Sequence, residues 1–189
     1  LGYSFHAHGE KGMLEANFGE NNSDNQRILQ TTIDFFKMRP GSRIWLDGQT
    51  HITIDDGYLP RYAIIQWTTY IRFNSTWDFN QDIVLNGNPE EYLLDKYFIQ
   101  VKVMQDFFES REIPYLMFNG FDNEKVIPNS TSKFKDLINT KYFIGWPDES
   151  VVNWVYGMPH KPKGHPGEEA HVRIAEIVYE NIRDKLRLP

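Results

Sequence analysis

The sequence has 189 residues, 40% hydrophobic and 15% aromatic, which is enough for one domain with a sizeable core and argues against two. Its formal charge of −6, without a run of Lys or Arg, argues against nucleic acid or an anionic membrane as the main partner and favours a small neutral or cationic ligand. The absence of cysteine excludes a disulfide framework, a thiolate nucleophile and a Cys-based zinc site.

The N-terminal third begins with a small-residue turn, Gly2-Tyr3-Ser4, and we expect the strand that leads into it to be cut short or to begin upstream. No apolar stretch of about 18 residues and no signal-peptide pattern follows, so we expect a soluble chain of undetermined compartment. Residues 25–38 carry apolar side chains at helical spacing and predict a helix capped near Asp24. Residues 43–54 alternate around Asp47-Gly48 and predict a short β-hairpin.

The middle of the chain predicts two strands of a parallel sheet with a helix between them. Residues 62–67 form a near-continuous apolar run, which is typical of a central strand buried on both faces. Residues 68–88 show no sustained period and predict a long loop. Asn88-Pro89-Glu90-Glu91 then opens a long helix that runs to Phe108. Residues 113–118 repeat the buried-strand pattern, so we expect this strand to lie parallel to the first and beside it.

The last third predicts short elements and then a terminal helix. A short helix is expected within 133–138, a short strand at 142–144, helical turns at 151–156 and a loop at 157–164. Pro166 suits the first helical position, and Glu168 and Glu169 favour the positive end of the helix dipole. One apolar stripe follows, which should pack on the sheet: Ala170, Ile174, Ile177, Val178, Ile182 and Leu186. Alternating helices and strands predict an α/β domain with a parallel sheet covered on both faces.

Polar residues that could carry chemistry follow the predicted strands. Ligands of open parallel sheets bind beyond the carboxyl ends of the strands, where we expect Ser4, Thr68, Thr69, Asn119 and Asp122. A serine hydroxyl becomes a nucleophile when a histidine takes its proton, and the oxyanion that results needs N–H donors. His165 stands immediately before Pro166 and so is expected in an extended or cap conformation that faces Ser4.

Three motifs carry a family resemblance: Gly2-Tyr3-Ser4-Phe5, the stretch 17–25, and Gly164-His165-Pro166. Together they resemble the SGNH (GDSL-type) serine hydrolases, in particular the compact members found in marine phages and bacteria, over nearly the whole chain. The resemblance implies a single flavodoxin-like domain over residues 1–189, a three-layer sandwich with a mostly parallel sheet. It also implies hydrolysis of small-molecule or glycan esters without a cofactor.

By this resemblance Ser4 is the nucleophile and His165 the base, and the oxyanion or substrate-binding residues are Asn22, Asn25 and Thr68. The chain departs from the family pattern at several positions. Tyr3 stands where the family has aspartate, Asn22 where it has glycine, and Thr68 lies near the position of its third-block asparagine. Pro162 replaces the aspartate expected three residues before the histidine. The residue that would orient His165 is left open among Asp148, Asp122 and Glu168.

Two other functions compete with the serine esterase. The departures permit a domain that has lost catalysis and serves as a binding or virion-associated structural module. Alternatively, His6 and His8 would share one face of an extended strand and could bind a metal with Glu10, His51 or His160. His171, inside the last helix, is expected to pack or to cap rather than to act as the base.

Overall fold

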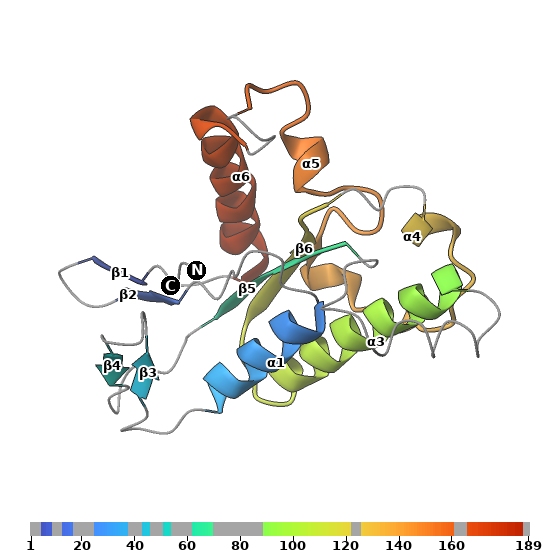
Figure 1. Cartoon of the computed structure of the whole chain (residues 1–189), viewed down its shortest axis with the longest axis horizontal. Helices are drawn as coiled ribbons and strands as arrows, with labels where there is room; N and C mark the ends of the chain where they lie inside the picture. The colour runs from blue at the N-terminus through green and yellow to red at the C-terminus, as the bar shows by residue number, and fades with distance from the viewer. Residues whose placement is uncertain are drawn as a thin grey trace.

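In the computed structural model, helices flank a small parallel β-sheet, so the chain has an α/β fold (Figure 1). The structure describes residues 5–8, 13–16, 25–37, 43–45, 51–53, 62–69, 89–121, 126–160 and 166–186. The sheet has the order β5 (Ala63–Trp67), β6 (Tyr115–Asn119) and β7 (Phe143–Ile144). Both pairings are parallel, and the β5–β6 register runs from Ala63 opposite Tyr115 to Trp67 opposite Asn119. The parallel pairing predicted for these two strands is therefore confirmed.

Two helices cover one face of the sheet: α1 (Asn25–Phe36) and α3 (Pro89–Glu109). Most apolar positions of α3 recur at three- and four-residue steps, which places them on the buried side of the helix. Ile99 and Val103 are the exceptions, at 41% and 43% exposed. Phe36 of α1 packs edge-to-face on Phe108 of α3, with 5.2 Å between the ring centroids. The main core on this face includes Ile65, Trp67, Tyr97, Phe98, Val101, Met104, Phe108, Tyr115 and Met117. Both helices were predicted from apolar spacing together with helix-start signals, and both are confirmed.

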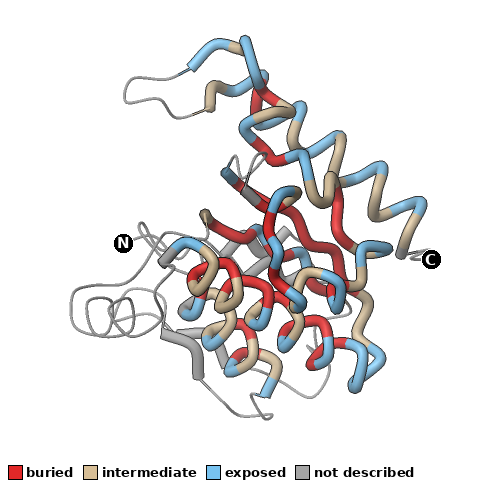
Figure 2. Tube along the Cα trace, turned by 90° about the vertical axis from the view of Figure 1, so that its right-hand side faces the viewer, coloured by how far each residue is buried: buried red, intermediate tan, exposed pale blue. Residues whose placement is uncertain are grey.

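The opposite face of the sheet is covered by α5 (Val151–Trp154) and α6 (Glu168–Asn181), which continues as a π-helical segment over Ile182–Leu186. Leu116 and Phe118 of β6 form a second core with Ile144 and Val151. Against it pack the residues of the predicted stripe, Ile174, Ile177, Val178 and Ile182. Figure 2 shows buried residues along the strands and on the inward sides of the helices. The sheet is thus the middle of three layers.

The connection from β6 to β7 contains three short elements: α4 (Val126–Asn129) and the 3₁₀ turns η1 (Lys135–Leu137) and η2 (Thr140–Tyr142). Polar contacts fasten it to α3. The Gln105 side chain donates to the Asn139 carbonyl at 2.9 Å and accepts from the Asn139 N–H at 2.8 Å. Glu91 accepts from the hydroxyls of Ser130 and Thr131 at 3.0 and 3.1 Å. These bonds hold an irregular segment against a regular helix.

Two antiparallel ladders stand apart from the parallel sheet. β3 (Arg43–Trp45) pairs with β4 (His51–Thr53), which confirms the predicted hairpin. β1 (Phe5–His8) pairs with β2 (Met13–Ala16), and this second ladder was not predicted.

The burial of β5 differs from the prediction. Residues facing α3 are buried, but Ile64 is 39% exposed and Gln66 is also exposed, so the strand is buried on one face only. The prediction that β5 is the central strand is wrong for the described sheet, in which β6 lies between β5 and β7. The physical reason is that the second core of α5 and α6 is built on β6 and β7 and leaves the matching face of β5 uncovered.

The start of α6 is also later than predicted. Gly167 is the N-cap, with extended backbone at φ −74° and ψ −178°, and the helix begins at Glu168. Pro166 is instead part of an isolated antiparallel bridge with His160. The Gly167 N–H donates to the Pro159 carbonyl at 3.1 Å, and a Cβ on Gly167 would lie 2.6 Å from that oxygen. This close approach of two backbones moves the helix start past the proline.

Candidate functional site

The predicted site residues fall into two groups. Ser4, Asn22, Asp122 and His165 lie outside the described residues, so the meeting of Ser4 with His165 stays a prediction. Asn25 and Thr68 are described, and they lie together.

A hydrogen-bonded clamp joins Asn25, the first residue of α1, to the chain just beyond β5. The Thr68 N–H donates to Asn25 Oδ1 at 2.9 Å, and Asn25 Nδ2 donates to the carbonyls of Thr68 and Thr69, each at 3.4 Å. Asn25 and Thr68 are both buried. The clamp fixes the amino end of α1 at the carboxyl end of β5. Because both polar atoms of the Asn25 amide are engaged by the chain itself, Asn25 is a tether here, and its part in substrate binding stays a prediction.

Asn119, predicted to face the same edge, is buried at the end of β6 and oriented by α3. The Tyr97 hydroxyl donates to Asn119 Oδ1 at 2.6 Å. Burial raises the pKa of Tyr97 well above its ordinary value, an effect that outweighs the opposing influence of the bond to Asn119. The phenol therefore remains protonated and keeps its O–H as the donor. With Oδ1 occupied by Tyr97, Asn119 Nδ2 is directed to the other side of the amide.

Two buried N–H groups at this edge have no acceptor among the described residues: Trp67 Nε1 and Asn119 Nδ2, named here the donor pair. The two residues are opposite each other in the last β5–β6 register position, so their side chains leave the sheet on the same face. The Trp67 ring also meets the Tyr97 ring edge-to-face, with 6.3 Å between centroids. In the sequence, Trp67 ends the apolar run of residues 62–67, which predicts a buried core residue. The sequence feature that hints at a polar role is the position of Trp67 as the last residue of a predicted strand, because ligands bind at the carboxyl ends of parallel strands.

The chain reaches the surface within two residues of Asn119, one member of the donor pair. Gly120 follows Asn119 and donates its N–H to the Trp67 carbonyl at 2.8 Å, which continues the ladder past the last register pair. A Cβ on Gly120 would lie 2.4 Å from Gln66 Nε2, so the glycine leaves room for that side chain. Phe121, the next residue, is 41% exposed. The edge therefore passes from a buried polar pair to an exposed aromatic within two residues.

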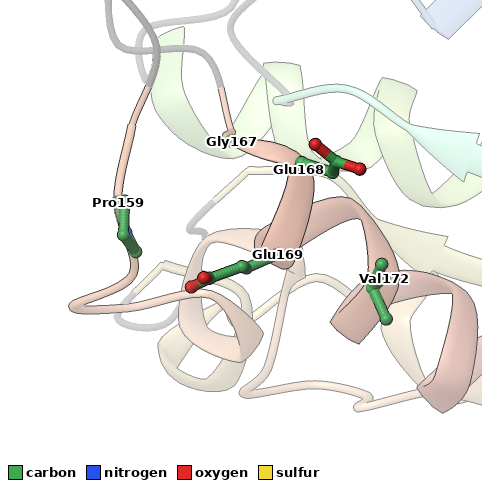
Figure 3. Close-up of a pocket in the computed structure, with 5 residues that line it drawn as sticks. All are labelled: Pro159, Gly167, Glu168, Glu169 and Val172. Carbon is green, nitrogen blue, oxygen red and sulfur yellow. The ribbon is translucent and has the colours of Figure 1, made fainter.

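A separate pocket of about 440 Å³ lies at the start of α6, lined by Pro159, Gly167, Glu168, Glu169 and Val172 (Figure 3). In the close-up the two carboxylates point away from each other. Both glutamates are exposed, as is Asp148, another residue considered as the orienting acid. His171 lies one turn further on. Of the two roles expected for it, packing or capping, packing is wrong because the residue is exposed. Its backbone N–H donates to the Gly167 carbonyl at 3.1 Å.

Among the described residues, no group of three His, Asp or Glu side chains could hold a metal ion. The backbone of β1 is extended at His6 and His8, but their side chains are outside the description. None of the helices in the described ranges combines the length and the apolar character needed to cross a bilayer.

The helices and the parallel sheet described above assign the chain to the α/β class. Comparisons with protein-family models, with curated proteins and with solved structures gave no significant match to this chain.

Proposed function

We propose that this chain is a serine esterase or acyl hydrolase of the SGNH type, with a flavodoxin-like fold, acting on a small or carbohydrate-linked ester. The observation that carries the proposal is the clamp between Asn25 and Thr68. The resemblance assigns these residues, 43 positions apart, to one site from two separate motifs. Their direct hydrogen bond at the carboxyl end of β5 supports that assignment, because this end of a parallel strand is where α/β folds bind ligands.

The proposed reaction proceeds in two steps. Ser4 Oγ attacks the carbonyl carbon of the ester while His165 accepts the hydroxyl proton, which gives a tetrahedral oxyanion. The carbon–oxygen bond to the alcohol then breaks, His165 returns the proton to the departing alcohol, and the acyl group stays on Ser4. Water, deprotonated by His165, attacks the acyl-serine and releases the acid and the free serine. Because Pro162 stands where the family has its orienting aspartate, we expect modest activity.

The test is hydrolysis of p-nitrophenyl acetate by the purified chain, with and without a chelator. Ser4→Ala should lower kcat/KM to the background rate, since losing a triad nucleophile can cost on the order of 10⁶-fold. Ser110→Ala is a matched control, because Ser110 is exposed and its hydroxyl bonds only nearby residues of the same segment. It donates to the Phe107 carbonyl at 3.0 Å and accepts from Arg111 Nη1 at 3.3 Å. His165→Ala should abolish turnover and the exposed His171→Ala should spare it. The opposite result for the two histidine variants would refute the assignment of the base.

The departures at Tyr3, Asn22 and Pro162 favour a second candidate, a related domain without catalysis that serves as a binding or virion-associated structural module. A folded wild-type chain that does not hydrolyse p-nitrophenyl acetate above background would favour this module. Turnover that the chelator abolishes would instead favour a metal enzyme that uses His6 and His8.

A further inference from the structure

We propose that the donor pair, Trp67 Nε1 and Asn119 Nδ2, binds one oxygen of the acyl group of the ligand, the carbonyl oxygen of an ester or a carboxylate oxygen of the product acid. This inference deepens the proposed function, on which its catalytic part depends. Its binding part is tested separately below.

The two unpaired donors are energetically costly. A buried N–H without an acceptor costs about 1–3 kcal/mol, and a native protein has few of them. Here two such groups occur at one register position of the sheet, Trp67 opposite Asn119, and both side chains are at most 1% exposed. Two unpaired donors placed together at a strand end, where α/β folds bind ligands, indicate a site for an acceptor that arrives with the ligand.

The donor pair is held rigidly by its neighbours. Tyr97 holds the Asn119 amide by its oxygen, and the Trp67 ring is fully buried between β5 and α3. Neither donor therefore needs to reorient when an oxygen arrives. Donors fixed in advance toward a polarised oxygen stabilise it more than donors that must first leave other partners.

The chemistry of the donor pair determines which class of ligand it can bind. Both groups are uncharged donors. The neutral Tyr97 contacts both residues, and Trp67 belongs to the apolar core formed with α3. Two neutral N–H groups in an apolar setting can satisfy one carbonyl or carboxylate oxygen, but they cannot offset the desolvation of a phosphate dianion. A cation is excluded because the pair offers only donors.

The binding test follows the indole N–H signals of the ¹⁵N-labelled wild-type chain during titration with sodium acetate at constant pH. We expect the Trp67 signal, identified as the one missing from Trp67→Phe, to shift and to saturate, whereas the Trp146 signal stays in place. Trp146 is the matched control because it packs on Phe98 and Phe143. A Trp67 signal that does not move, or that moves equally with sodium chloride, would overturn the inference and point to an internal water or an adventitious ion only.

The catalytic test compares Trp67→Phe with Trp146→Phe. Trp67→Phe removes one N–H and keeps an aromatic ring, so we expect kcat/KM for p-nitrophenyl acetate to fall about 10²-fold, measured at a temperature at which circular dichroism shows the variant to be folded. Trp146→Phe should stay within about twofold of wild type, as expected for a ring outside the site. Unchanged kcat/KM in Trp67→Phe would overturn the catalytic part. If the wild type shows no turnover, the proposed esterase fails, while the acetate titration still decides whether the donor pair binds an acyl oxygen.

Discussion

At the scale of single residues, Asn25 makes three hydrogen bonds to the backbone beyond β5. Asn25→Ala would remove the acceptor of the Thr68 N–H and leave that N–H buried. We expect the free energy of unfolding to fall by about 1–3 kcal/mol, because an unpaired buried donor loses its hydration without compensation. Urea denaturation followed by circular dichroism measures this change.

Gln30→Ala is the control for this prediction. Gln30 lies on the same helix, α1, but is exposed and bonds only the Asp34 carboxylate, at 2.9 and 2.8 Å. Its loss should change stability by no more than about 0.5 kcal/mol. Equal effects of the two substitutions would mean that the Asn25 clamp adds nothing beyond helix propensity.

Some residues of the candidate site could be predicted from the sequence, and others could not. Asn25 and Thr68 could be named from short motifs, because each stands at the boundary of an element with a clear pattern. The donor role of Trp67 could not be named, because it depends on which residue lies opposite Trp67 across the sheet and on Tyr97 occupying the oxygen of Asn119. Such pairings depend on the register between neighbouring strands, which the residue pattern of one strand does not determine.

At the scale of elements, α6 offers two valines in different surroundings. Val178 packs on the second core, whereas Val172 is 55% exposed. Val178→Ala should lower the free energy of unfolding by about 1–2 kcal/mol, because apolar contacts with the sheet are lost. Val172→Ala makes the same chemical change on the same helix and should stay within about 0.5 kcal/mol of wild type. Thermal unfolding of the two variants checks the prediction, and equal losses would mean that α6 does not dock through this stripe.

The helices were predictable because their apolar positions recur at 3.6-residue spacing, as the stripe from Ala170 to Ile182 shows. The one-sided burial of β5 was not predictable, since Ile64 is apolar yet faces the side that α6 does not cover. The late start of α6 was missed for a similar reason. Pro166 has the right chemistry for a first helical turn, but pairing with His160 holds it outside the helix.

At the scale of the whole molecule, two buried tyrosines link stability to alkaline pH. Burial raises the pKa of both Tyr97 and Tyr115 above the ordinary value of 10, and the hydrogen bond from Tyr115 to Glu109 raises that of Tyr115 further. The folded state then retains protons that the unfolded chain loses. The stabilisation is therefore complete below pH 10 and is lost as pH rises above it.

The expected result is a steeper loss of stability above pH 10 in the wild type than in the double variant Tyr97→Phe, Tyr115→Phe. The extra slope should approach about 1.4 kcal/mol per pH unit for each tyrosine. Urea denaturation at several pH values between 8 and 11 measures both curves, and lysine titration is common to the two proteins. Parallel curves would contradict the raised pKa values.

The position of β6 between the two cores determines how the domain unfolds. β6 contributes alternate residues to both cores: Tyr115 and Met117 to the face of α3, and Leu116 and Phe118 to the face of α6. Neither helical layer can separate from the sheet without uncovering one side of this strand. Partial unfolding that exposes β6 would thus cost nearly as much as unfolding the domain. We expect its backbone amides to exchange their hydrogens with solvent last of all, through global opening alone, which makes β6 the kinetic anchor of the fold.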